Sequence, residues 1–275
     1  MEGTTFSAAA TGTVTLSSGA RMPALGLGTW QLSGDQAAPA VEHALGLGYR
    51  LIDTAVDYGS EPGIGEALRS SPVDRDEIFV VDKVEEDEDA YAAAAERLET
   101  LGMDRLDLCL IHRPPSRGAG EELWAGLIEA RRNGLTREIG VSNYSSEQID
   151  RLIEVSGERP AVNQVEWSPF GHSEELIRYA ERNGIVIQAY SPLTRGERLG
   201  DETLGEIGAR HGRTSAQVLL RWSLQVGAAP VPKAASAEHR EENLDVFDYQ
   251  LDGAEMSALS GLNQGYSSLG GLPYA

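Results

Sequence analysis

The chain has 275 residues and a mass of 29.5 kDa, which is enough for one large barrel or two modest domains. Hydrophobic residues make up 41% of it and charged residues 24%, as in an ordinary soluble globular protein. The formal net charge of −20 argues against nucleic acid or an anionic membrane as the main partner. We also expect a monomer.

The first residues, 1–12, have neither a basic nor an apolar signal region, and we expect them to form a flexible tail. The single cysteine, Cys109, allows no internal disulfide, and a cytoplasmic location is expected. Residues 14–25 place a Ser-Gly turn between two short extended pieces. They predict a β-hairpin that closes the bottom of the main fold.

Eight apolar, strand-like runs then recur along the chain. They lie at 24–29, 49–55, 78–84, 106–112, 138–143, 161–167, 185–192 and 228–234. Segments with helical spacing of apolar residues separate them, many opening on Ser or Thr and closing on Gly. These segments are 37–48, 91–102, 121–134, 145–157, 173–184 and 214–227. A Gly-x-Gly in 61–68 lacks the third glycine of a dinucleotide fingerprint and reads better as a helix start.

Eight such units without a linker predict a closed (β/α)₈ TIM barrel, more than a doubly wound open sheet, with residues 13–275 as one domain. The Gly-rich segment 261–275 is too irregular for a barrel element.

Ionisable side chains gather at the predicted carboxyl ends of three neighbouring strands. Asp53, Lys83 and His112 each end a strand, and Tyr58 follows Asp53 by five residues. Alone, each could be a helix cap or a packing residue, but a charge at the end of a buried strand is costly unless it is paired. Lys83 is one of only two lysines against twenty-one arginines. We expect it to pair with Asp53 and to lower the pKa of Tyr58 toward neutrality.

Several segments resemble the aldo-keto reductases, especially their bacterial and archaeal, diketogluconate-reductase-like members. They are D-T-A-x-x-Y at 53–58, FVVDK at 79–83, IHRP at 111–114, GVSNY at 140–144, NQVEWSPF at 163–170, AYSPL at 189–193 and VPKAASAEHREENLDVFDYQL at 231–251. The resemblance runs from the hairpin to about residue 260, and it implies that the segment 261–275 forms a loop at the barrel mouth. It implies NADP(H)-dependent hydride transfer to an aldehyde or ketone and no metal; the histidines and the cysteine show no ligand spacing.

By this resemblance, Tyr58 is the general acid, Asp53 and Lys83 tune it, and His112 places the substrate as a neutral imidazole donor. The implied cofactor-binding residues are Ser142, Asn143, Gln164, Tyr190, Ser191, Leu193, Lys233, Ser236, His239, Glu242 and Asn243. The first three would hold the nicotinamide carboxamide, Tyr190 would stack on its ring, and the residues from Lys233 onward would hold the adenosine end. Arg195 and Arg198 are either pyrophosphate partners or solvated loop charges.

Two departures from the family pattern concern the cofactor. Ala234 replaces a frequent serine, and His239 stands where an arginine is frequent, with Arg240 one step out of register. Both changes weaken contacts to a 2′-phosphate, so we expect NAD(H) to be accepted alongside NADP(H). The alternative is that Arg240 swings in and restores the contact.

The substrate side is marked by Trp30, expected as a pocket wall, and by Arg113, where the family usually has tryptophan. Arg113 could receive the carboxylate of a keto acid or a sugar-derived carbonyl compound, or it could pair with Glu85 or Glu86 and close the pocket. A second function remains open: a redox-sensing regulatory protein that binds the cofactor on the same fold with little turnover.

Overall fold

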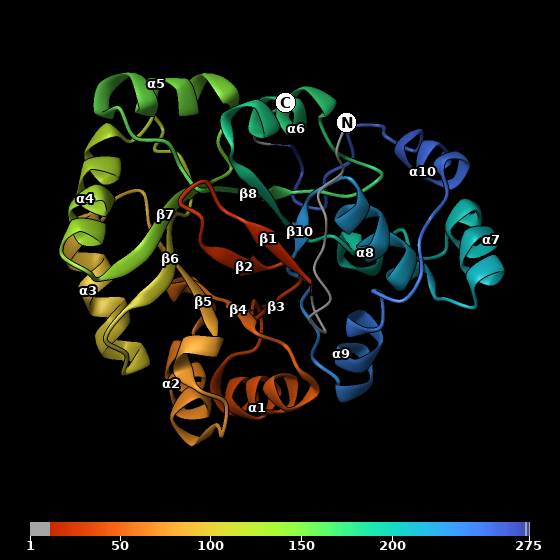
Figure 1. Cartoon of the computed structure of the whole chain (residues 1–275), viewed down its shortest axis with the longest axis horizontal. Coiled ribbons are helices and arrows are strands. Elements are labelled where there is room, and N and C mark those ends of the chain that lie inside the picture. The colour runs from red at the N-terminus through yellow and green to blue at the C-terminus, as the bar shows by residue number, and fades with distance from the viewer. Residues whose placement is uncertain (1–11, 273, 275) are drawn as a thin grey trace.

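The computed structural model describes residues 12–272 and 274, and its centre is a barrel of eight parallel strands (Figure 1). The expected N-terminal tail lies outside the described residues except for Gly12. The strands are β3 (Leu27–Gly28), β4 (Leu51–Asp53), β5 (Phe79–Val84), β6 (Leu106–Ile111), β7 (Thr136–Ser142), β8 (Val162–Glu166), β9 (Val186–Tyr190) and β10 (Ala229–Pro230). Each pairs with the next along the chain, so all eight predicted strands are confirmed.

The sheet closes between its first and last strands. The Gly26 N–H donates to the Pro230 carbonyl at 3.0 Å, and the Gly28 N–H donates to the Pro232 carbonyl at 3.1 Å. A side chain at position 28 would place its Cβ 2.6 Å from the carbonyl oxygen of Val231, so only glycine permits this approach. The predicted closed (β/α)₈ barrel is thereby confirmed.

Helices surround the barrel (Figure 1). They are α1 (Ala37–Leu47), α2 (Glu61–Ser70), α3 (Ala90–Leu101), α4 (Glu121–Arg132), α5 (Ser146–Ser156), α6 (Glu174–Asn183), α7 (Glu202–His211), α8 (Ser215–Gln225), α9 (Ala237–Leu244) and α10 (Gly253–Ser260). The six predicted from periodicity are present, and 61–68 is a helix start as expected. Helices α7, α9 and α10 lie outside the predicted helical segments.

Cap residues set the ends of the predicted helices. Helix α5 begins with a capping box, in which the Ser145 hydroxyl accepts from the Gln148 N–H and the Gln148 side chain accepts from the Ser145 N–H. It ends at Gly157, whose φ of 72° is left-handed and suits glycine. Helix α8 begins with the same arrangement at Thr214 and Gln217.

The hairpin of β1 (Thr13–Thr15) and β2 (Arg21–Pro23) covers the amino-terminal end of the strands. At its turn, the Ser18 hydroxyl donates to Glu138 near the start of β7. Met22 is fully buried, and its sulfur accepts from the Gln188 side chain at 3.9 Å. The hairpin therefore plugs the end of the barrel opposite the strand carboxyl ends. No helix in the described part of the chain is both long and apolar enough to span a bilayer.

Candidate active site

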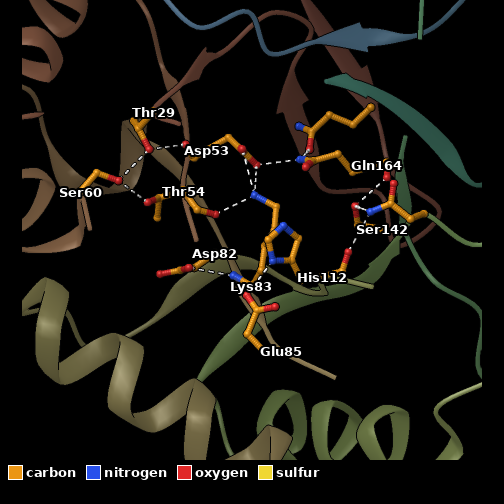
Figure 2. Close-up of polar contacts among 12 residues, drawn as sticks. Thr29, Asp53, Thr54, Ser60, Asp82, Lys83, Glu85, His112, Ser142 and Gln164 are labelled. Atoms are coloured by element: carbon orange, nitrogen blue, oxygen red, sulfur yellow. Dashed lines mark hydrogen bonds and ion pairs between the residues drawn. The ribbon is translucent and has the colours of Figure 1, made fainter. Parts of the chain in front are cut away.

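Lys83 lies at the centre of the barrel mouth with no exposed surface (Figure 2). Its Nζ donates to both carboxylate oxygens of Asp53, at 3.0 Å each, and to the Thr54 carbonyl at 2.7 Å. Burial favours the neutral amine, but the Asp53 carboxylate and the Tyr58 hydroxyl outweigh it and raise the pKa of Lys83. The residue is therefore an ammonium with its charge directed at two neighbours.

Tyr58 is brought over this ammonium by a short 3-10 helix, Val56–Tyr58, that follows β4. The Lys83 Nζ lies 5.1 Å from the centre of the phenol ring. The turn is held by Ser60, whose hydroxyl hydrogen bonds with those of Thr29 and Thr54 at 3.0 and 2.8 Å (Figure 2). Three buried hydroxyls thus fix the loop that presents the phenol.

The expected lowering of the Tyr58 pKa is wrong for the protein without ligands. Burial raises the pKa of Tyr58, and the opposing effect of Lys83 does not overcome it, partly because Asp53 offsets the ammonium charge. At neutral pH the phenol keeps its proton. It can therefore donate a proton at the cleft.

His112 follows β6 and lies beside Tyr58, with ring centres 6.1 Å apart in an edge-on arrangement. Its Nδ1 is 2.6 Å from Oε1 of Glu85 (Figure 2). The sequence indicates Glu85 only as one of two possible partners of Arg113, not as a partner of His112. A signal was present, because side chains alternate along a strand and Glu85 follows Lys83 by two positions.

A row of polar side chains on β7, β8 and β9 continues from the ion pair. Gln164 Nε2 donates to Asp53 at 2.7 Å and to Gln188 at 2.6 Å, a residue that the sequence analysis left unassigned. The Ser142 hydroxyl donates to the Gln164 carbonyl at 2.7 Å, and Asn143 Nδ2 donates to the His112 carbonyl at 3.0 Å. These bonds hold the three predicted carboxamide-binding residues in fixed orientations.

Tyr190 completes this row, since its hydroxyl donates to Asn143 Oδ1 at 2.8 Å. Asn143 itself has a left-handed backbone, with φ of 67°, a conformation that asparagine tolerates better than most residues. The turn after β9 is left-handed as well at Ser191, Thr194 and Arg195.

Many of these groups border one cleft of about 590 Å³. Most predicted site residues line it, namely Trp30, Asp53, Tyr58, His112, Arg113, Ser142, Asn143, Gln164, Tyr190, Ser191, Leu193, Lys233 and His239. The cleft thus joins the Tyr58 end to the Lys233 end across the mouth of the barrel. Lys83 does not line the cleft; it lies beneath it and is bonded to Asp53.

Three predicted cofactor residues on or before α9 are not among those lining the cleft. Ser236 caps α9 by accepting from the His239 N–H, and the Glu242 carboxylate accepts from the Thr214 hydroxyl. Asn243 is buried, and its Nδ2 finds no hydrogen-bond partner among the described residues.

Arg240 is engaged below the loop that carries Lys233. It is buried, and its guanidinium donates to the carbonyls of Ala234 and Ala235 at 3.0 and 2.9 Å and to His43 at 3.2 Å. These contacts tie Arg240 to the backbone and argue against its swinging into the cleft.

The two loop arginines, Arg195 and Arg198, have different surroundings. The Arg195 guanidinium stacks on the Trp30 ring at 4.3 Å and lines the cleft, whereas Arg198 lies over the Tyr266 ring at 4.5 Å and is not part of the lining.

The C-terminal segment is tied to the mouth by Glu166, at the end of β8. The hydroxyl of Ser267 and the N–H of Ser268 donate to this buried carboxylate at 2.6 and 2.7 Å, and Leu269 lines the cleft.

The molecule is a (β/α)₈ barrel with a buried Asp–Lys pair, a phenol and a histidine beside a long polar cleft at the carboxyl ends of its strands, the end at which barrel enzymes hold their active sites. The model of the Aldo/keto reductase family matches residues 24–264, and the chain belongs to this family.

Individual relatives cover nearly the whole chain. It is 43% identical over 264 residues to an aldo-keto reductase of Mycolicibacterium vanbaalenii, with 94% of this chain and 95% of that protein covered. It is 41% identical over 259 residues to 2,5-diketo-D-gluconic acid reductase B of a Corynebacterium species, with 92% and 94% covered. An aldo-keto reductase of Bombyx mori, solved in complex with NADP, matches with a TM-score of 0.86 at 33% identity, covering 93% and 94%.

Proposed function

We propose that this protein reduces aldehydes or ketones to alcohols with NADPH, using Tyr58 as the general acid. The observation that carries the proposal is the buried Asp53–Lys83 pair, directly beneath a phenol that faces the cleft. A fully buried ammonium at a barrel mouth has little structural value that an apolar residue could not supply. Its position under the phenol gives it a chemical purpose.

The cofactor, when bound, supplies a hydride to the carbonyl carbon. The carbonyl oxygen then gains negative charge, and the Tyr58 hydroxyl donates its proton to it. The phenolate left behind is stabilised by the Lys83 ammonium until water returns the proton. His112 donates a hydrogen bond to the same oxygen, so the charge develops between two donors.

The cleft fits a long nicotinamide cofactor. The Ser142, Asn143 and Gln164 side chains at one end suit a carboxamide, and Tyr190 offers a ring for stacking. At the other end Lys233 suits a phosphate. The Asn243 side-chain nitrogen, ten positions further on and outside the cleft lining, has no partner among the described residues and would be a donor for a purine. With Arg240 held against the backbone and the Ala234 side chain unable to hydrogen bond, NADH is accepted as well as NADPH.

Arg113 gives the substrate site a positive charge. Glu85, one of its two expected partners, bonds to His112 instead, and the Arg113 guanidinium makes no ion pair within residues 12–272 and 274. It is exposed and lines the cleft beside the catalytic groups. We therefore favour carbonyl substrates with a carboxylate, such as keto acids or oxidised sugars, since a guanidinium binds carboxylates with two parallel hydrogen bonds.

The test follows the loss of reduced-nicotinamide absorbance with two matched substrates, butanal and succinic semialdehyde. Succinic semialdehyde carries a terminal carboxylate where butanal has a methyl group. We expect kcat/KM of the wild type to favour the acid by about tenfold, or about 1.4 kcal/mol, and Arg113→Trp to remove the preference while keeping butanal turnover.

The same assay is run with NADPH and NADH. A preference for NADPH beyond about a thousandfold, some 4 kcal/mol, would contradict the expected acceptance of NADH. A protein that binds NADPH but turns over neither these nor a broader panel of carbonyls would instead support the redox-sensing alternative.

A further inference from the structure

The Glu85–His112 contact determines which ring nitrogen meets the substrate. Oε1 of Glu85 lies 2.6 Å from Nδ1, with the two side chains only 13% and 8% exposed. Nε2 has no hydrogen-bond partner in the described part of the chain, and His112 lines the cleft. Nε2 is therefore the nitrogen available to a carbonyl oxygen.

The loop that carries Glu85 is clamped in place. The Glu85 N–H donates to Glu88 at 2.8 Å, and Arg97 on α3 donates to both Glu88 oxygens at 2.5 and 2.7 Å. The Arg97 side chain is 2% exposed and also donates to the Lys83 carbonyl at 3.3 Å. Arg97 thus holds Glu85, through Glu88, in a fixed position relative to Lys83.

The number of protons on the His112 ring decides whether Nε2 can donate a hydrogen bond. A carboxylate at Nδ1 requires a proton on that nitrogen, because two acceptors repel. A neutral ring would then have its only proton on Nδ1 and a bare lone pair on Nε2. It could not donate to a carbonyl oxygen, and the neutral donor expected from the sequence does not fit this geometry.

We propose that Glu85 is a positioning residue that keeps His112 doubly protonated, so that an imidazolium N–H meets the substrate oxygen. The role of this imidazolium rests on the proposed carbonyl reduction. Its protonation does not, because it can be measured without turnover. A cationic donor stabilises developing negative charge more strongly than a neutral one.

The other charges around the ring agree with this state. The carboxylate of Asp57 lies within 4.8 Å of the Glu85 and His112 ligand atoms and also favours a cation. Of the two opposing charges, Lys83 is paired with Asp53 and Arg113 is exposed to solvent. Burial alone would raise the pKa of Glu85, but His112 and then Arg113 outweigh it and lower the pKa, so Glu85 is a carboxylate at neutral pH.

The direct test is the ¹⁵N spectrum of the histidine rings in the full-length protein, with His112 assigned from its absence in His112→Asn. We expect both His112 nitrogens to be protonated at pH 7.5 in the wild type and only one in Glu85→Gln. This measurement needs no turnover, so it decides the proposal even if no carbonyl substrate is reduced.

The kinetic test compares kcat/KM for butanal across pH. For Glu85→Gln we expect a loss of about tenfold at pH 7.5 that narrows toward pH 5.5, where the ring is protonated in both proteins. Glu86→Gln is the matched control: it removes the same charge from the neighbouring, exposed position and should leave the profile unchanged.

Two results would overturn the proposal. One is a wild-type His112 with a single protonated nitrogen at pH 7.5. The other is a Glu85→Gln loss of equal size at both pH values, which is what a purely structural role of Glu85 would produce.

Discussion

At the scale of single residues, Lys83 shows why one lysine was kept in an arginine-rich chain. Its Nζ fits a space bounded by two carboxylate oxygens and one carbonyl oxygen, all within 3.0 Å. An ammonium is a compact point charge, whereas a guanidinium is a planar fork that needs more room. The site therefore selects for lysine by shape as well as by charge.

We expect Lys83→Arg to keep the fold and to reduce kcat by about a thousandfold or more. The reason is that a guanidinium cannot pair with Asp53 and lie beneath the phenol at the same time. Steady-state NADPH oxidation measures the loss, and circular dichroism checks the fold. Lys233→Arg is the matched change at the other lysine; there turnover should persist, and the KM for NADPH should be the parameter that moves. Wild-type turnover by Lys83→Arg would refute the role assigned to this ammonium.

At the scale of elements, the two faces of strand β5 contribute side chains to two different sites. Lys83 points into the barrel mouth, whereas its neighbour Asp82 is buried on the opposite side, toward the helices. Asp82 accepts from the Lys83 N–H at 2.8 Å, while its Oδ2 and Oε1 of Glu61 on α2 have no conventional donor among the described residues. The simplest account is a proton shared by these two carboxyl groups.

This pair should make stability depend on pH. Burial first, and then the Glu61 carboxylate, raises the pKa of Asp82 well above its usual range. An acid whose pKa is higher in the folded state stabilises the fold at low pH. That contribution declines as pH rises from the unfolded value, about 4, through the folded pKa.

We expect Asp82→Asn to flatten this decline, because asparagine keeps the acceptor for the Lys83 N–H and can donate to Glu61. Urea unfolding at intervals from pH 5 to pH 9 should show the wild type losing about 1–3 kcal/mol more than the variant. Asp87→Asn, in the exposed loop after the same strand, controls for net charge. Parallel curves for wild type and Asp82→Asn would exclude a shared proton.

At the scale of the whole molecule, the dominant electrostatic feature is repulsion among like charges. Asp and Glu number 43 against 23 Lys and Arg, so ion pairs cannot neutralise most of the carboxylates. Self-repulsion of this kind destabilises a compact state, and salt screens it over about 10 Å at 0.1 M.

We therefore expect Tm to rise by several degrees, roughly 3–6 °C, between 10 mM and 0.5 M NaCl, as measured by scanning calorimetry. Potassium chloride at equal ionic strength should give the same rise, since screening does not depend on the cation. An unchanged or falling Tm would show that surface ion pairs, which salt weakens, outweigh the repulsion.

Much of the architecture could be predicted because its signals are local. Apolar runs of strand length, helical spacing between them and cap residues such as Ser145 and Gly157 each depend on a few neighbouring residues. Helix α9 is harder to predict, since its eight residues include only two that are buried, Arg240 and Asn243, and neither is apolar. Its place is set by contacts such as Arg240 with the 234–235 backbone.

The candidate site also has residues that the sequence predicts and residues that it does not. That Asp53, Lys83, His112 and Tyr58 converge was predictable, because parallel strands end on one edge and the order of residues shows which ends are charged. The sequence indicates Glu85 less directly, because it follows Lys83 by two positions but its partner His112 lies 27 positions away. Gln188 is not indicated, because its partner Gln164 lies 24 positions away along the chain.

The sequence by itself thus determined the barrel, the family and the identity of the groups at its mouth, since each is written in short segments and their order. Only the tertiary structure decided the protonation of those groups. Whether Tyr58 keeps its proton, which nitrogen of His112 faces the cleft and whether Arg113 is paired depend on burial and on distances between side chains from different strands. Free energies of ionisation change with these distances, and no local pattern in the chain records them.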